Sequence, residues 1–194
     1  MPITEFGCSN IKPGTDPLDE TTHEGKVLAE AWKSVTQHSN GPYRGYYGVE
    51  VEDPSKLWCF FDFESVQDHE NFAKTFGGEA AKDLPNILHS PEFNGKHLSL
   101  NSYPPTALQS PVTEILLAYF APPTPQHQKD AATSKLSQFA TNALHKCPDV
   151  HAVNFGWTIE DDIPVRGGSV DGQKGSILVA LIGWPSVEAH MEFR

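Results

Sequence analysis

The chain has 194 residues, of which 38% are hydrophobic and 20% are charged, as in an ordinary soluble globular protein. Its formal net charge is −11 and it shows no cluster of Lys and Arg, which argues against nucleic acid and anionic membranes as partners. No apolar run approaches the ~20 residues of a membrane-spanning helix.

The N-terminus and the cysteines bear on where the protein works. The first residues lack the basic and hydrophobic regions of a signal peptide, and the three cysteines (Cys8, Cys59 and Cys147) are scattered and odd in number. Both features predict a cytoplasmic protein with reduced thiols. The sequence has no C-x-x-C, H-x-H or H-E-x-x-H spacing and no phosphate-binding glycine loop, so we expect neither a metal nor a cofactor.

The first half of the chain predicts the element order β-α-β-β-α-β. Strands are expected at 3–11, 43–51, 57–63 and 97–103, and helices from Thr21 to the break at Asn40 and over about 65–75. Thr21 and Glu24 form a capping-box pattern at the start of the first helix. An irregular helical segment is expected at 79–89. The first helix carries an apolar stripe of Val27, Leu28, Ala31, Trp32 and Val35.

The second half repeats the first. The phrase Ser65-Val66-x-x-His69-x-x-Phe72 returns as Ser186-Val187-x-x-His190-x-x-Phe193, each time after a strongly apolar run. Pro2 to Phe6 is echoed by Pro111 to Ile115, and the helical stripe is echoed by Leu136, Phe139, Ala140 and Ala143. An insertion at 163–175 lengthens the second copy. Matched segments in one order predict a tandem duplication.

The proline-rich residues 104–110 separate the copies as a linker. We therefore predict a first repeat at 1–103 and a second repeat at 111–194 that lacks its last strand. The order β-α-β-β-α-β is that of the ferredoxin-like fold. The predicted fold class is α+β, with two tandem ferredoxin-like repeats whose antiparallel sheets pack face to face within one chain. Such units could pair further as a homodimer.

The strand-to-helix phrases Phe61-Asp62-Phe63-Glu64-Ser65 and Ile182-Gly183-Trp184-Pro185-Ser186, each continued by the histidine motif, resemble the dimeric α+β barrel superfamily. Within it the chain is similar to the antibiotic-biosynthesis-monooxygenase-like (ABM-like) group in its fused two-repeat form. The resemblance implies a dimeric α+β barrel with a ligand cavity between sheet and helices. Members include cofactor-independent monooxygenases, polyketide cyclases, haem-degrading enzymes and proteins without an assigned reaction.

His69 is the first catalytic candidate, with Asn10 and Tyr46 beside it in a cavity of the first repeat. A neutral imidazole in an apolar cleft can act as a general base, here on a phenol or an activated methylene group. The resulting carbanion would react with oxygen or close onto a carbonyl group. The competing interpretation is that His69 and His190 only pack under their helices, and the repetition of the motif favours it.

The ligand-binding candidates are Trp58, Tyr103, Tyr119 and His190, which would line a cavity for a flat aromatic molecule. Asn10 and Tyr119 occupy equivalent first-strand positions and make the two repeats different. Haem-degrading members carry a first-strand asparagine together with a second-helix tryptophan that this chain lacks, so haem is not expected. His97 is expected at an exposed strand edge.

The resemblance thus implies a cofactor-independent monooxygenase or cyclase of the secondary-metabolism kind. Its partner would be a small apolar molecule, aromatic or polyketide-like. The alternatives are a non-catalytic ligand-binding or stress-responsive barrel protein and a structural association module.

Overall fold

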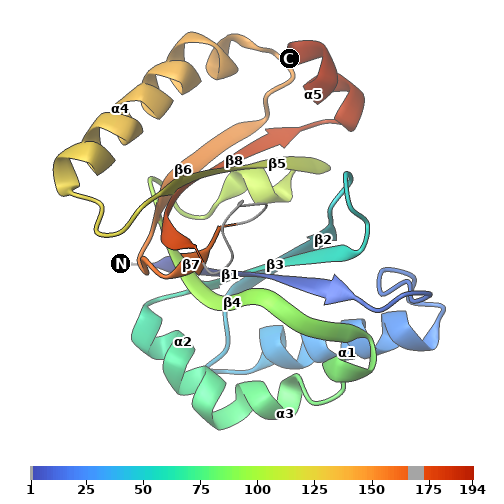
Figure 1. The fold of residues 1–194 in the computed structure, drawn as a ribbon. Coiled ribbons are helices and arrows are strands. Elements are labelled where there is room, and N and C mark those ends of the chain that lie inside the picture. Colours follow the sequence, from blue (N-terminus) through green and yellow to red (C-terminus); the bar gives the residue numbers. More distant parts are fainter. Residues whose placement is uncertain (1, 166–172) are drawn as a thin grey trace. The chain divides into compact units, whose positions relative to one another are not determined.

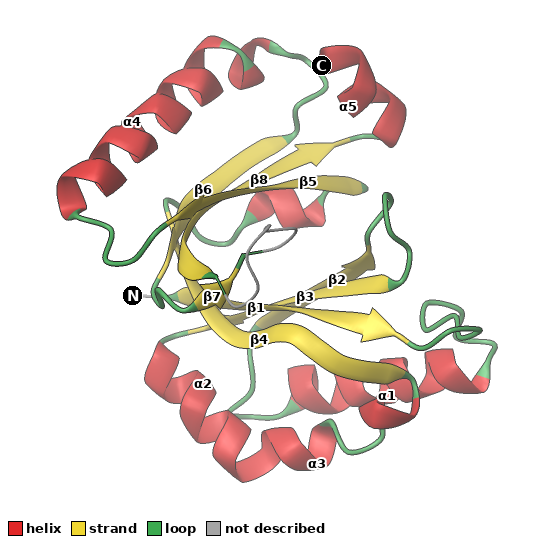
Figure 2. Cartoon of the chain, in the orientation of Figure 1, coloured by secondary structure: helices red, strands yellow, loops and turns green. Residues whose placement is uncertain are grey.

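The computed structural model describes residues 2–165 and 173–194, except for the side chains of Ser90, Glu92 and Asn94. The chain divides into two compact units, Met1–His97 and Leu98–Arg194 (Figure 1). Each unit combines antiparallel strand pairs with helices, so the predicted α+β fold class is confirmed (Figure 2). No helix in the described part of the chain is long and apolar enough to cross a membrane.

The first unit is a sheet in the order β2-β3-β1-β4, with β1 and β2 antiparallel to β3 and the helices on one face (Figure 2). Its strands are β1 (Ile3–Ile11), β2 (Arg44–Val49), β3 (Lys56–Phe63) and β4 (Leu88–Leu100), the last of which runs on into the second unit. Its helical elements are α1 (His23–Gln37), α2 (Val66–Phe72), the π-helical turn η1 (Ala73–Gly77), α3 (Gly78–Ala80) and the 3₁₀ turn η2 (Leu84–Asn86). This is the predicted ferredoxin-like order.

The second unit places β8 between β5 and β6, and the end of β4 at Leu98–Leu100 pairs with β6. Its strands are β5 (Val112–Phe120), β6 (Ala152–Thr158), β7 (Ile163–Pro164) and β8 (Lys174–Trp184). Its helical elements are η3 (Thr106–Gln109), α4 (Gln126–Asn142), η4 (Leu144–Lys146) and α5 (Val187–Phe193). Residues 166–172 of the predicted insertion lie outside the described residues.

The segment 104–110, predicted as a linker, packs on the second unit. It contains η3, in which Ala107 is completely buried. The backbone N–H of Ala107 donates to Oδ1 of Asn154, a buried residue of β6, at 2.9 Å. The segment belongs to the compact unit Leu98–Arg194.

The two units pair their strands in the same register. Ile3 faces Phe63 across β1 and β3, and their counterparts Val112 and Trp184 face each other across β5 and β8. The correspondence holds along both ladders. The helices α2 and α5 also begin alike, each after a serine N-cap whose hydroxyl accepts a backbone N–H from three residues on.

Two element boundaries differ from the sequence-based expectation. The N-cap of α1 is Thr22, whose Oγ1 accepts the N–H of Gly25 at 3.0 Å. Thr21, the predicted cap, instead donates its hydroxyl to Asp19 at 2.7 Å. β4 begins at Leu88, within the stretch expected to be helical and well before residue 97.

The stripe on α1 packs against the sheet as predicted. Leu28 forms a buried cluster with Ile11 of β1, Leu57 of β3 and Ile87, which immediately precedes β4. Each of these four side chains is at most 7% exposed. Because the cluster joins α1 to the strands at one end, it fixes the helix over the face of the sheet on which the cavity described next is found.

Candidate active site

The first unit contains a cavity of about 220 Å³ between its sheet and its helices. The strands provide the floor, and the segment from Ala80 to Leu88 closes one side. The wall on α1 consists of the predicted stripe residues Leu28, Ala31, Trp32 and Val35. Most of the lining is therefore apolar.

Strand alternation decides which side chains reach the cavity. Successive side chains of a strand point to opposite faces. The cavity takes every second residue of two neighbouring strands, namely Glu5, Gly7 and Ser9 of β1 and Leu57, Cys59 and Phe61 of β3. Residues between them, such as Phe6 and Phe60, pack on the other face with ring centroids 6.4 Å apart. Among the described residues that line the cavity, Glu5 is the one carboxylate.

Glu5 joins the cavity to a pair of histidines. Its Oε2 lies 3.2 Å from Nε2 of His69 on α2, and its side chain is 18% exposed. Burial raises the pKa of Glu5 from 4.5 to about 7, although the nearby His97 and the backbone N–H of Gly95 both lower it. A carboxyl group that titrates near neutral pH can take up or release a proton under physiological conditions.

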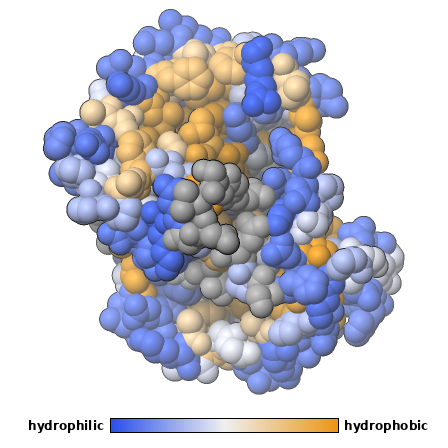
Figure 3. Space-filling view, viewed as in Figure 1, coloured by the Kyte–Doolittle hydropathy of each residue, from blue (hydrophilic) through white to orange (hydrophobic). Residues whose placement is uncertain are grey.

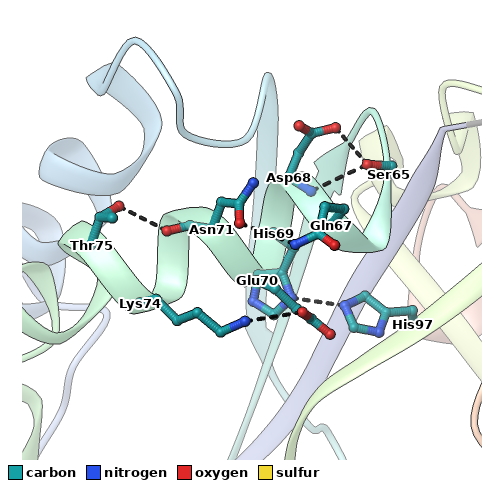
Figure 4. A network of polar contacts seen from close by, with 9 residues as sticks. All are labelled: Ser65, Gln67, Asp68, His69, Glu70, Asn71, Lys74, Thr75 and His97. Carbon is teal, nitrogen blue, oxygen red and sulfur yellow. Dashed lines mark hydrogen bonds and ion pairs between the residues drawn. The ribbon is translucent and has the colours of Figure 1, made fainter.

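The second histidine is His97 of β4. Its Nε2 lies 2.8 Å from Nδ1 of His69, and Figure 4 shows the two rings side by side between α2 and the strand. His97 is 4% exposed and the side chain of His69 is 12% exposed. Two imidazole nitrogens at this distance share a proton, one as N–H donor and the other as acceptor. Glu5, His69 and His97 therefore form a continuous chain of hydrogen-bonding groups.

The N-cap of α2 orients His69. The hydroxyl oxygen of Ser65 accepts the backbone N–H of Asp68 at 3.2 Å, which fixes the first turn of the helix. His69 follows immediately and packs against Phe63 at the end of β3, with ring centroids 5.0 Å apart. The sequence motif thus places the imidazole at the junction of strand and helix, within reach of β1 and β4.

A glycine in β4 allows His97 to reach the same place. Phe93 packs its ring 5.1 Å from Phe6, on the face of the sheet away from the helices, whereas His97 contacts α2. Regular alternation would put residues 93 and 97 on one face. Gly95 lies between them with a φ of +60°, a left-handed conformation that glycine adopts without strain. The change of face in β4 occurs at this glycine, as in a β-bulge.

Three of the predicted site residues lie away from the cavity. Asn10, Tyr46 and Trp58 occupy the alternate strand positions, on the face opposite to Glu5. Asn10 accepts a hydrogen bond there from the ammonium group of Lys56. Because side chains alternate, a displacement of one position along a strand is enough to exchange the faces. The structure therefore brings Glu5 and His97, rather than Asn10 and Tyr46, to His69.

The other predicted ligand-binding residues belong to the second unit. The hydroxyl of Tyr103 donates to the carbonyl of Leu98 at 2.9 Å and accepts the N–H of Leu100 at 3.2 Å, so it braces the chain after β4. Tyr119 is opposite Ile177 in the ladder of β5 and β8. Neither tyrosine lines the cavity described above.

His190 repeats the position of His69 and also contacts a glutamate. Its Nε2 lies 3.5 Å from Oε2 of Glu114, the β5 counterpart of Glu5. Nε1 of Trp184 donates to the same carboxylate oxygen at 3.3 Å. Among the described residues, no second histidine ring lies against His190. The glutamate–histidine pair is thus common to both units, and the third member belongs to the first unit.

The units also differ in the size of the side chains beside the pair. Gly7 and Ala31 line the first-unit cavity, and the equivalent positions in the second unit carry Leu116 and Phe139. These two side chains are 36% and 44% exposed. Figure 3 shows apolar side chains at the surface of the second unit between α4 and α5. The first unit thus has the smaller residue at both positions, and both line its cavity.

The sequence pattern does not single out Glu5, and it predicts His97 at an exposed strand edge. A signal for Glu5 existed, because the repeated phrases Pro2 to Phe6 and Pro111 to Ile115 both contain a Thr-Glu pair on an otherwise apolar strand. His97 had no comparable signal. Its burial depends on a strand that begins nine residues earlier than expected and on the change of face at Gly95.

Cys59 is the other titratable side chain in the cavity. Burial, together with the neighbouring Glu5 and Cys8, raises the pKa of its thiol to about 12. The thiol therefore stays protonated and is a poor nucleophile at neutral pH. Proton transfer through Glu5 is the chemistry that the arrangement supports.

No protein-family model matches the sequence, and neither does any curated protein. Among solved structures, an anthrone oxidase-like protein is 13% identical with a TM-score of 0.67, covering 100% of this chain and 77% of that one. A candidate monooxygenase from Fusobacterium nucleatum is 9% identical with a TM-score of 0.55, covering 100% and 80%. A candidate chlorite dismutase is 14% identical with a TM-score of 0.52, covering 99% and 83%. At these identities the likeness shows the fold alone, and it agrees with the α+β fold class predicted from the sequence.

Proposed function

We propose that the chain is a cofactor-independent enzyme of the monooxygenase or cyclase type that removes a proton from a small apolar ligand in the first-unit cavity. Glu5 is the base. The observation that supports this most directly is a single carboxylate with a pKa of about 7 at the wall of a largely apolar cavity. His69, the base expected from the sequence, contacts Glu5 behind that wall and acts through it.

The size of the cavity limits the ligand. An apolar protein cavity of about 150 Å³ is large enough to bind benzene. The cavity of about 220 Å³ therefore suits a molecule of one or two fused rings. Trp32 and Phe61 both line it with ring centroids 4.5 Å apart and ring planes inclined by 31°, and they offer an aromatic wall. We infer that the ligand is a small aromatic molecule.

The reaction begins with transfer of a proton from an activated methylene group to Glu5, while the C–H electron pair stays on the ligand as a carbanion. In a monooxygenase these electrons reduce molecular oxygen, and the methylene becomes a carbonyl group with release of water. In a cyclase the carbanion forms a C–C bond with a carbonyl carbon of the same ligand. Anthrone, named in the description of one structural neighbour, is a ketone with such a methylene group.

The proton transfer can be tested without choosing between the two reactions. The probe is 2-tetralone, a two-ring ketone with an activated methylene group, incubated in deuterated buffer without oxygen and followed by proton NMR. We expect the wild-type protein to accelerate deuterium incorporation and Glu5→Gln to reduce the enzymatic rate by about 10²-fold or more. Admitting oxygen afterwards and measuring its consumption identifies a monooxygenase.

Glu114→Gln is the matched control, because Glu114 has the same place in β5 and also contacts a histidine. We expect it to leave the exchange rate unchanged. An equal loss in both variants would overturn the assignment of Glu5. Binding of 2-tetralone without any exchange would instead support the alternative of a non-catalytic ligand-binding protein.

We also infer that the two units arose by tandem duplication. The shared strand registers, the serine caps of α2 and α5 and the repeated glutamate–histidine contact support this origin. After such an event one copy can keep a site while the other diverges. The small residues Gly7 and Ala31, together with His97, favour the first unit as the one that works on the ligand.

A further inference from the structure

The chain of polar groups does not end at the base. Nε2 of His69 lies 3.2 Å from Glu5, and Nδ1 on the other side of the same ring lies 2.8 Å from His97. An imidazole with a partner on each nitrogen can accept a proton on one side and release another on the opposite side. His97 lies beyond His69, at 4% exposure, and is too well buried to be a surface group.

We propose that His69 and His97 form a proton relay that takes up the proton Glu5 removes from the ligand, with His97 as the far end of the relay. This rests on the proposed function of Glu5 and assigns His97 a role in it. His97 touches neither cavity nor ligand, so it is a positioning and proton-holding residue that acts through His69.

The steps balance as follows. Glu5 first binds the ligand proton and becomes a neutral acid. Its O–H then donates to Nε2 of His69, while Nδ1–H of His69 donates to Nε2 of His97. Moving each proton along its hydrogen bond restores the Glu5 carboxylate, leaves His69 neutral as the other tautomer and makes His97 an imidazolium. No electrons leave these three groups. Their total charge rises by one when Glu5 binds the ligand proton and stays constant during the transfers among them.

The groups around Glu5 favour transfer of its proton to the two histidines. The titratable groups that face Glu5 are His69 on α2, His97 on β4 and Cys59 on β3, and the Cys59 thiol stays neutral because burial raises its pKa. Once His97 holds the proton, its positive charge lowers the pKa of Glu5 and so favours the carboxylate form. Separating the proton from the ligand by two side chains slows its return to the carbanion.

The relay is tested first without turnover. Nitrogen-15 NMR of the histidine rings in the ligand-free protein reports the tautomer and protonation of each one as the pH is changed. We expect His69 and His97 to titrate as a coupled pair, and Glu5→Gln to move both midpoints. His127 on α4, which is exposed, serves as the reference that should not move. Midpoints of His69 and His97 that shift by less than about 0.3 pH unit in Glu5→Gln would overturn the relay.

The second measurement is the pH profile of deuterium exchange into 2-tetralone. His97→Gln keeps a hydrogen-bonding side chain but cannot hold a proton. We expect its exchange rate to fall by about tenfold and the acidic limb of its profile to move to higher pH, because the charge that lowers the pKa of Glu5 is lost. His127→Gln should match the wild-type profile. A slower rate with an unmoved profile would reduce His97 to a packing role.

The two measurements separate the two proposals. If the wild-type protein exchanges no probe, the proposed function fails while the NMR titration still decides whether the three groups share a proton. The relay fails and the proposed function stands under the following result. Exchange depends on Glu5, but the pH profile does not move in His97→Gln and the midpoints of His69 and His97 do not move in Glu5→Gln. The NMR experiment on the wild-type protein does not depend on the folding of His97→Gln.

Discussion

Replacing Glu5 by Gln should make the protein more stable, and increasingly so as the pH rises. The pKa of Glu5 is raised from 4.5 to about 7 in the folded protein because the carboxyl group is largely buried. An acid whose pKa rises on folding binds its proton more tightly in the folded state. Its contribution to stability is therefore complete below pH 4.5 and is lost as the pH rises through 7.

The size of the effect follows from the shift. At ~1.4 kcal/mol per pKa unit, a rise from 4.5 to about 7 corresponds to a loss of about 3 kcal/mol well above neutral pH. Part of this stability is already lost below about pH 5.5. The further loss between about pH 5.5 and about pH 8 is about 2 kcal/mol. The Gln side chain does not titrate. The gap in unfolding free energy between Glu5→Gln and the wild type should thus widen by about 2 kcal/mol over this interval.

Urea denaturation of both proteins at the two pH values measures the gap. Glu114→Gln controls for the general effect of removing one negative charge from a chain with a net charge of −11. A gap that stays constant within about 0.5 kcal/mol would refute the raised pKa of Glu5, and with it the reason for assigning Glu5 as the base. A gap that widens as expected would show that the site is maintained at a cost in stability.

Three further substitutions test other parts of the structure. Ala31→Phe should fill the cavity and weaken binding of a two-ring ligand by about tenfold or more in titration calorimetry, and an unchanged affinity would place the ligand elsewhere. Thr4→Val should lower the unfolding free energy by about 1–3 kcal/mol in urea denaturation, because it removes the 2.7 Å hydrogen bond to the buried carboxylate of Asp62. Ser65→Ala should cost about 1 kcal/mol in the same assay through loss of the α2 N-cap, whereas a change below about 0.3 kcal/mol would mean that packing alone fixes the helix start.

Much of the fold follows from local pattern. β1 begins and ends where the alternating stretch 3–11 does, and the serine caps of both motif helices are where the repeated phrase puts them. The N-cap of α1 lies one residue later than predicted, because two adjacent threonines are both able to cap. The hydroxyl of the first, Thr21, donates to Asp19, so Thr22 is the cap. The early start of β4 is not predictable from local sequence. Pro91 and Gly95 interrupt its strand pattern, and only pairing with distant strands makes this stretch extended.

The site was less predictable than the fold. β1 is buried on both faces, so alternation separates Glu5 from Asn10 but does not say which of them faces the helices. The choice of Asn10 came from the resemblance and from its contrast with Tyr119, and the structure puts Asn10 on the face away from the cavity. The contact of His69 with His97 joins a helix to a strand 28 positions away, a pairing that no short-range pattern encodes.

The repeated glutamate–histidine contact also makes the molecule its own internal reference. Glu114 and His190 have the same strand register and the same capped helix as their first-unit counterparts, at 3.5 Å rather than 3.2 Å. A single spectrum therefore records one pair backed by another histidine and one pair backed by Trp184, in the same buffer and at the same temperature. Differences between the two signals isolate what the third group adds, with no second protein to prepare.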